Sequence, residues 1–226
     1  MREIPAKYAD WFENNRRILE TAYVSHDEPW RQSGMSGPED RWISLRKPVA
    51  DCIERSGTFL DIGCANGYLI ECILKWTAER GLSIEPFGLD LSEKLVSMAK
   101  QRLPDHAGNF FVGNSFTWLP PRRFDYVRTE LVYVPLELER EYVEFLIENH
   151  LTDDGRLIIP NYAEGLELSG ELFPNGYPTA FLAERMEQIG IEPERYLEGY
   201  DPVKGRRMKV AVVSGRQEQD AEANRP

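Results

Sequence analysis

The segment from Asp61 to Gly67, with the sequence DIGCANG, constrains the fold of this chain more than any other feature. An apolar run at residues 58–62 leads into it and a helical pattern follows, so we expect a strand, a tight turn and a helix. Gly63 can take positive φ and lets backbone approach a ligand, while Gly67 lets the helix pack closely on the strand. Free amides at the helix start accept polar or anionic groups. Asp61, however, would repel a pyrophosphate, and it favours an amino group or a hydroxyl.

A second carboxylate ends the next apolar run, which extends from Ile84 to Asp90. Asp90 lies 23 residues after Gly67, which is the length of one helix and one strand. In a βαβ unit this spacing places Asp90 at the carboxyl end of the neighbouring parallel strand, where it can accept both hydroxyls of a ribose. Ser92 is the expected N-cap of a helix that runs to Arg102. The alternative role of Asp90 is that of a capping residue only.

A third run, Phe110 to Ser115, is rich in β-forming residues and closes with small polar ones. We expect a short strand that ends beside the same crevice. The side-chain carbonyl of Asn114 can accept a hydrogen bond from an amino group. The alternative is an Asn-Ser turn that hydrogen-bonds its own backbone.

A fourth β-rich run, residues 124–134, fits a central strand followed by a loop that ends at Pro135. The next segment has a helical apolar pattern made by Leu138, Tyr142, Phe145, Leu146 and Leu151. Residues 153–160, with the sequence DDGRLIIP, are typical of a turn that enters a fifth strand.

These landmarks, in this order over residues 59–160, resemble the class I S-adenosylmethionine-dependent methyltransferases. The resemblance implies a three-layer, doubly wound Rossmann-like α/β fold, with a seven-stranded, mostly parallel sheet and an antiparallel last strand. In this family an acidic residue before a G-x-G-x-G turn meets the amino group of the cofactor, and Asp61 holds that position. Ala65 replaces the usual middle glycine, and its extra methyl fits if the local φ stays negative.

The resemblance also implies the cofactor, S-adenosyl-L-methionine, with S-adenosyl-L-homocysteine as product. Asn114 stands where the family carries an Asp or Asn that reads the adenine amino group. The residues expected to bind the cofactor are Asp61, Gly63, Cys64, Ala65, Gly67, Asp90, Leu91, Asn114, Ser115 and Glu130.

The implied reaction is an in-line displacement in which an acceptor atom attacks the S-methyl group. Because a sulfonium is already activated, the protein mainly holds the two reactants in attack geometry and excludes water. The candidate catalytic residues are His26, Glu130 and Tyr133. His26 belongs to the N-terminal segment, and its alternative is an ordinary surface histidine. Tyr133 orients an acceptor or simply packs.

Missing signatures narrow the acceptor class. The Asp/Asn-Pro-Pro-aromatic motif of enzymes that methylate DNA bases and glutamine amides is absent, since Thr129 to Val132 occupy its place. Metal-dependent catechol-type enzymes carry an acidic residue at the end of the fourth strand and an Asp-Asn pair after the fifth. Glu130 and Asn161 supply only part of this set, and Pro160 stands where a carboxylate belongs. We therefore expect a metal-independent enzyme with an aromatic pocket and a small-molecule substrate.

The chain divides into three parts. Residues 1–38 are a helical segment rich in aromatic residues, which either closes over the pocket as a lid or covers the sheet as a surface helix. Residues 39–215 form the methyltransferase-like domain, within which residues 161–177 are a loop-like substrate wall. Residues 216–226 are polar and expected to be disordered.

Composition restricts partners and compartment. The 226 residues carry a net charge of −11, which argues against broad nucleic-acid binding. No apolar stretch approaches the roughly 20 residues of a membrane span, and no signal peptide is visible, so a cytoplasmic protein without membrane partners is expected. The three cysteines include no CxxC pair, and Cys64 in the turn is expected to pack as a small hydrophobe rather than act as a nucleophile.

Two other functions are compatible with parts of the pattern. A nicotinamide-dependent oxidoreductase shares the strand-turn-helix and the ribose carboxylate, but Asp61 stands where its pyrophosphate would lie. A non-catalytic methyltransferase-like binding subunit would keep the fold while losing the cofactor motif, whereas Asp61, Gly63, Gly67 and Asp90 are all present.

Overall fold

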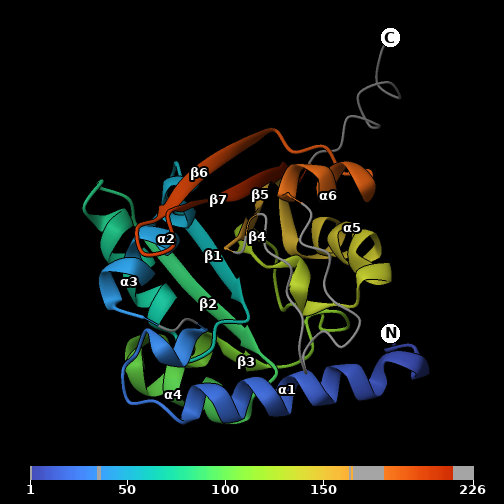
Figure 1. Ribbon diagram of the computed structural model, residues 1–226, viewed down its shortest axis with the longest axis horizontal. Coiled ribbons are helices and arrows are strands. Elements are labelled where there is room, and N and C mark those ends of the chain that lie inside the picture. Colours follow the sequence, from blue (N-terminus) through green and yellow to red (C-terminus); the bar gives the residue numbers. More distant parts are fainter. Residues whose placement is uncertain (1, 35–36, 163, 165–180, 216–226) are drawn as a thin grey trace.

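The computed structural model describes residues 2–34, 37–162, 164 and 181–215. Within these residues a single seven-stranded sheet has the order β3-β2-β1-β4-β5-β7-β6 (Figure 1). The strands are β1 (Gly57–Ile62), β2 (Ile84–Asp90), β3 (Phe110–Val112), β4 (Phe124–Arg128), β5 (Leu151–Asn161), β6 (Arg195–Asp201) and β7 (Arg206–Ser214). Strand β7 runs antiparallel to both β5 and β6, and the remaining pairs are parallel. The predicted fold class is confirmed.

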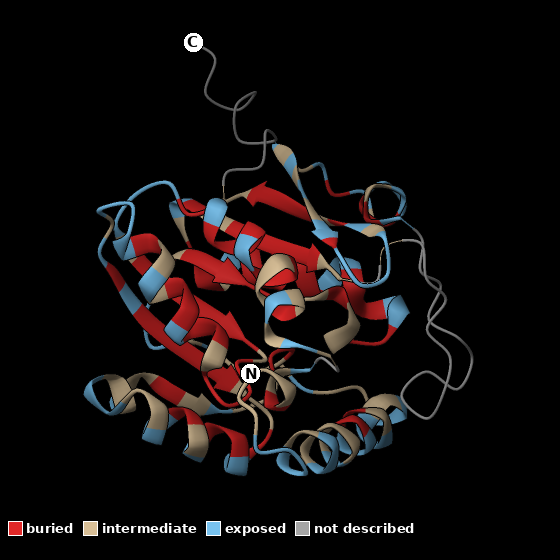
Figure 2. Cartoon of the chain, turned by 60° about the vertical axis from the view of Figure 1, so that its left-hand side comes forward, coloured by how far each residue is buried: buried red, intermediate tan, exposed pale blue. Residues whose placement is uncertain are grey.

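Helices cover both faces of the sheet (Figures 1 and 2). One face carries α2 (Glu39–Asp51), α3 (Tyr68–Ala78) and α4 (Glu93–Arg102), and the other carries α5 (Glu139–His150) and α6 (Leu182–Gln188). Successive strand residues point to opposite faces: Leu157 and Ile159 of β5 pack in the core under α5, whereas Ile158 packs in the core under α2 and α3. The central strands are therefore buried on both faces, as a three-layer fold requires, whereas the edge strand β6 is partly exposed.

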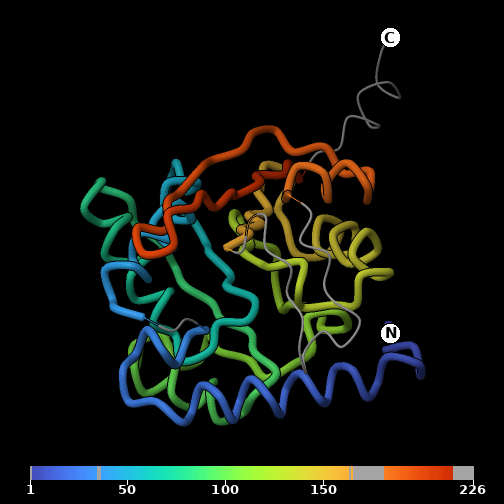
Figure 3. Tube along the Cα trace, in the orientation of Figure 1, coloured from blue at the N-terminus to red at the C-terminus, as the bar shows by residue number. Residues whose placement is uncertain are grey.

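Helix α1 (Ala9–Val24) lies outside the three layers. It crosses the carboxyl ends of the central strands, with the N-terminus near α5 and its last turn near α4 (Figures 1 and 3). Glu20 fixes this last turn, because it pairs with Lys94 at 2.8 Å and accepts a hydrogen bond from Ser92 at 2.8 Å. A helix is thus present within residues 1–38, and it covers the carboxyl ends of the strands rather than a face of the sheet.

The segment after α1 is attached to the glycine turn. The side-chain amide of Asn66, which is fully buried, donates to the backbone carbonyl of Pro29 at 3.0 Å and to Gln32 Oε1 at 2.9 Å. Because Asn66 belongs to the DIGCANG segment, the N-terminal segment and the turn share one hydrogen-bond network.

Several local predictions are confirmed. Ser92 caps α4, and its Oγ accepts from the Leu95 amide at 3.2 Å. The last two strands form the expected hairpin, and Gly190 ends α6 with φ of 68°. Most of the predicted substrate wall, from residue 165 to 177, lies outside the described residues, as does the predicted disordered tail. None of the described helices is both long and apolar enough to cross a membrane.

Candidate functional site

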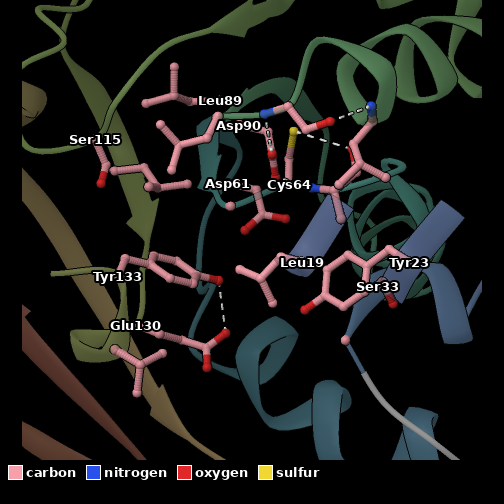
Figure 4. Close-up of a pocket in the computed structure, with 18 of the residues that line it drawn as sticks. Leu19, Tyr23, Ser33, Asp61, Cys64, Leu89, Asp90, Ser115, Glu130 and Tyr133 are labelled. Carbon is pink, nitrogen blue, oxygen red and sulfur yellow. Dashed lines mark hydrogen bonds between the residues drawn. The ribbon is translucent and has the colours of Figure 1, made fainter. Parts of the chain in front are cut away.

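A cavity of about 320 Å³ opens where the carboxyl ends of β1, β2, β3 and β4 meet helix α1 (Figure 4). Most of the residues predicted at the site line it: Asp61, Gly63, Cys64, Ala65, Asp90, Leu91, Ser115, Glu130 and Tyr133. The parallel arrangement explains the convergence, since the strands end at the same edge of the sheet and their last residues face one crevice.

Asp61 is the most deeply buried carboxylate of the cavity, with 1% of its surface exposed. Its Oδ1 lies 3.3 Å from Nη1 of Arg128 on β4. Its Oδ2 has no hydrogen-bond partner among the described residues. Burial raises the pKa of Asp61 to about 6, against the opposing effect of the Arg128 guanidinium. The cavity therefore contains a carboxylate oxygen that lacks a donor, and a cationic ligand group would supply one.

Asp90 ends the neighbouring strand β2 and faces the same cavity. Its Oδ2 accepts from the Ala65 amide at 2.9 Å, and its Oδ1 accepts from the Ser92 amide at 2.9 Å. Each carboxylate oxygen can accept a second hydrogen bond. Burial raises the pKa of Asp90 as well. Asp90 thus holds the turn together and still has capacity for two ligand hydroxyls.

Ala65 corrects one prediction about the turn. Its φ is +46°, in the left-handed region, so the alanine is accommodated without the negative φ that its fit was thought to require. Ala65 is the second residue of a four-residue turn that is closed by a hydrogen bond from the Gly67 amide to the Cys64 carbonyl at 2.9 Å. The hydrogen bond from the Ala65 amide to Asp90 offsets part of the strain that a side chain incurs at positive φ.

The two glycines of the turn have different roles. A Cβ on Gly63 would lie 2.5 Å from both Cζ and Oη of Tyr133, so the phenol rests directly on this glycine. A Cβ on Gly67 would lie 3.1 Å from Cβ of Ala99 on α4. Gly67 therefore permits close packing of α3 against α4 rather than against the strand, and it does not belong to the cavity lining.

Arg128 organises the polar cluster at the end of β4, with 3% of its surface exposed. Its Nη1 donates to Tyr133 Oη at 2.8 Å, its Nη2 is paired with Glu130, and Tyr133 Oη donates to Glu130 Oε1 at 2.9 Å. Burial acts to lower the pKa of Arg128, but the surrounding phenols and carboxylates outweigh it and raise that pKa. Sequence reasoning missed this residue, although a charged residue at the end of an apolar strand was a visible signal.

Arg46 is a second cavity residue that sequence reasoning missed. It lies on α2 with 5% of its surface exposed, and its guanidinium carbon stands 3.5 Å from the centre of the Tyr162 ring. Its Nη1 has no hydrogen-bond partner among the described residues. An arginine on the otherwise apolar face of the helix pattern was the available signal. Stacking on Tyr162 holds the cation in place while a donor stays available.

Helix α1 covers the cavity with one stripe of side chains. Trp11, Asn15, Leu19 and Tyr23 follow one another at intervals of four residues and therefore share one face of the helix. In Figure 4, Leu19 and Tyr23 lie across the cavity from Tyr133, and the Tyr23 hydroxyl points into it.

Besides Gly67, two further residues predicted at the site lie outside the cavity lining, His26 and Asn114. His26 follows α1 in an exposed turn and is not among the residues that line the cavity. Asn114 uses its Oδ1 to accept from the Phe116 amide at 2.9 Å, which is the local turn considered as its alternative. No group of three His, Cys, Asp or Glu residues within the described ranges is arranged to hold a metal ion.

Comparisons with known proteins identify the fold. No protein-family model matches the chain, and no curated protein matches it. Among solved structures, 1,6-didemethyltoxoflavin-N1-methyltransferase of Burkholderia thailandensis, with bound 1,6-didemethyltoxoflavin and S-adenosylhomocysteine, is 17% identical over 95% of this chain and 92% of its own, with a TM-score of 0.67.

Two further structures share the architecture. Magnesium protoporphyrin IX methyltransferase of Synechocystis PCC 6803, with bound SAM, is 19% identical over 91% of this chain and 98% of its own, with a TM-score of 0.59. A SAM-dependent methyltransferase of Leishmania major is 16% identical over 90% of this chain and 83% of its own, with a TM-score of 0.67. The chain therefore has the fold of the class I SAM-dependent methyltransferases.

Proposed function

We propose that this protein is a methyltransferase that uses S-adenosyl-L-methionine to methylate a small-molecule acceptor without a metal ion. The observation that carries the proposal is the pair of unsatisfied polar atoms in one buried cavity, Asp61 Oδ2 and Arg46 Nη1. A carboxylate without a donor and a guanidinium without an acceptor are complementary to a free amino acid, which carries one ammonium and one carboxylate. Asp90 on the adjacent strand supplies the acceptor for ribose hydroxyls.

The charges of the cavity support this cofactor over a dinucleotide. The described lining contains four carboxylates and three guanidiniums, from Glu20, Asp61, Asp90 and Glu130 and from Arg16, Arg46 and Arg128. A pyrophosphate at the turn would meet Asp61 and Asp90 at close range, which is unfavourable in a buried site. A sulfonium nucleoside with an amino acid group is net cationic and suits the same residues.

The bound cofactor supplies an activated methyl group, and the residues of this chain supply position and a dry site. Gly63 and Ala65 expose backbone at the turn, Asp61 and Arg46 orient the amino acid portion, and α1 covers the opening. Positioning of this kind accounts for a large part of the rate of an in-line transfer. Tyr133 and Glu130 face the cavity beside the turn and are proposed to orient the acceptor.

A metal-independent reaction fits the donor set. Glu130 is the acidic residue at the end of β4, but its carboxylate is paired with Arg128 and accepts from Tyr133. A guanidinium at this distance repels a divalent cation, and the carboxylate is already occupied. The chemistry of these side chains therefore favours hydrogen bonding over metal coordination.

A thermal-shift titration tests the proposal. S-adenosylmethionine and S-adenosylhomocysteine are expected to raise the melting temperature in a concentration-dependent manner, because both bind only the folded protein. NAD⁺ is expected to leave it unchanged. Stabilisation by NAD⁺ alone would favour the oxidoreductase alternative. Stabilisation by the methyl donor without turnover of any small-molecule acceptor would favour a binding subunit.

A further inference from the structure

Asn15 is a buried polar side chain of the cavity that the proposed cofactor contacts do not require. It lies in the middle of α1, lines the cavity and has 7% of its surface exposed. Its side-chain amide forms no hydrogen bond with any described residue. Both its donor and its acceptor are therefore available to a ligand in the cavity.

The charged residues beside Asn15 already form ion pairs. Arg16 pairs with Glu13 at 2.6 Å and with Glu20 at 3.2 Å, and Glu20 also holds Lys94. The polar groups of α1 that line the cavity and remain available are neutral: the amide of Asn15 and the hydroxyl of Tyr23. A ligand that faces them therefore gains most from hydrogen bonds that involve no charge.

The position of Asn15 points to the methyl acceptor rather than the cofactor. The polar groups proposed for the cofactor belong to strand ends and to α2, namely Asp61, Asp90 and Arg46. Asn15 lies on α1, a different element that contributes none of these three groups. The indole of Trp11, one turn before Asn15, also lines the cavity and offers a flat apolar surface against which a ring can stack.

We propose that Asn15 recognises the acceptor, and that the acceptor is a planar, uncharged heteroaromatic molecule with a carbonyl beside a ring N–H. The Asn amide donates through its NH₂ group and accepts through its oxygen, so it matches such an edge with two parallel hydrogen bonds. The inference rests on the proposed function, because it assumes that the strand ends and α2 hold the cofactor.

Two probes of equal shape test this recognition. 2-Quinolone carries the carbonyl and the adjacent N–H, whereas coumarin has the same bicyclic outline with an oxygen in place of the N–H. Binding of each is measured by calorimetry to protein saturated with S-adenosylhomocysteine. The wild-type complex is expected to bind 2-quinolone at least tenfold more tightly than coumarin, because a site built to accept from an N–H disfavours the analogue that lacks it.

Variants at two adjacent positions separate recognition from packing. Asn15→Leu is expected to weaken 2-quinolone binding at least tenfold and to abolish its preference over coumarin, with the affinity for S-adenosylhomocysteine unchanged within twofold. Asn14→Leu changes the exposed residue next to it on α1 and is expected to alter neither. Asn15→Ala, which removes both the amide donor and the amide acceptor without adding bulk, replaces the leucine variant if that variant fails to fold, with the same expected loss.

Three results would overturn the inference. They are equal binding of 2-quinolone and coumarin by the wild-type complex, absence of 2-quinolone binding, and a tenfold loss of S-adenosylhomocysteine affinity in Asn15→Leu, which would assign the amide to the adenine. Failure of the wild-type protein to bind S-adenosylhomocysteine would instead overturn the proposed function, so the two failures are distinguishable.

Discussion

Asp61 and Arg128 meet at 3.3 Å between Oδ1 and Nη1, at the carboxyl ends of two adjacent buried strands, and the second carboxylate oxygen of Asp61 stays without a donor. The arginine stabilises the carboxylate without saturating it. An incoming ammonium group can therefore bind Asp61 without displacing the ion pair.

Replacing Asp61 with Asn is expected to weaken binding of S-adenosylhomocysteine by about 1–3 kcal/mol, the scale of one charge-assisted hydrogen bond. Calorimetric titration of the folded variant measures this loss. Asp51→Asn, at the exposed end of α2, is the control and is expected to bind as the wild type does. Equal affinities of all three proteins would refute the role of Asp61.

The same interaction predicts a pH dependence of binding. Burial raises the pKa of Asp61 to about 6, so the carboxylate is ionised above that pH and neutral below it. The affinity for S-adenosylhomocysteine is expected to fall by up to roughly tenfold for each pH unit below about 6. The Asp61→Asn variant is expected to show a flat profile between pH 5 and 7, and a wild-type profile in that variant would exclude Asp61 as the titrating group.

Arg46 is expected to contact only the amino acid portion of the cofactor. Arg46→Gln should weaken S-adenosylhomocysteine by roughly tenfold or more, since a charged donor is lost. Binding of 5′-methylthioadenosine, which has the same nucleoside and no amino acid group, should stay unchanged. Competition titrations with both ligands provide the comparison, and an equal loss for both would place Arg46 elsewhere.

Gly63 and Gly81 form a matched pair for testing the contact between the turn and Tyr133. Their φ values are +74° and +75°, so alanine incurs a similar backbone strain of roughly 1–2 kcal/mol at either position. A Cβ on Gly81 meets nothing within 4 Å, whereas one on Gly63 lies 2.5 Å from the Tyr133 ring. Chemical denaturation should therefore show a larger loss of stability for Gly63→Ala than for Gly81→Ala. Only Gly63→Ala should also impair cofactor binding.

His150 is expected to make the fold sensitive to acid. It is fully buried between Trp118 and Phe145, and burial lowers its pKa to about 4. Between pH 6.5 and 4 the unfolded chain therefore binds more protons at this site than the folded one, so its contribution to stability is complete above 6.5 and decreases as the pH falls to about 4. The total decrease is roughly 3 kcal/mol.

Comparing wild type with His150→Phe isolates this contribution. Asp61 changes stability in the opposite direction between about pH 4 and 6, because its folded pKa is raised, and the difference between the two proteins removes that effect. Denaturation at pH 7 and pH 5 is the measurement. A stability difference that does not change with pH would show that His150 does not titrate in this range.

Most of the sheet, and the part of the site formed by the strand ends, could be predicted from the sequence. Buried parallel strands appear in a sequence as apolar runs, and their carboxyl ends converge on one side of the sheet. Asp61 and Asp90 were found in this way. The positive φ of Ala65 could not be read from the sequence, because alanine rarely adopts it and only the closed turn between Cys64 and Gly67 shows it. Side chains that reach the cavity from outside the βαβ units, such as Arg46 and Asn15, carry no fixed spacing from the turn, so only tertiary packing reveals them.

A crystal structure of the complex with S-adenosylhomocysteine tests the central claim most directly. We expect the amino group of the ligand within hydrogen-bond distance of Asp61, its carboxylate at Arg46, and both ribose hydroxyls at Asp90. A ligand bound elsewhere, or lying in the cavity with its ribose away from Asp90 and its amino group away from Asp61, would contradict it.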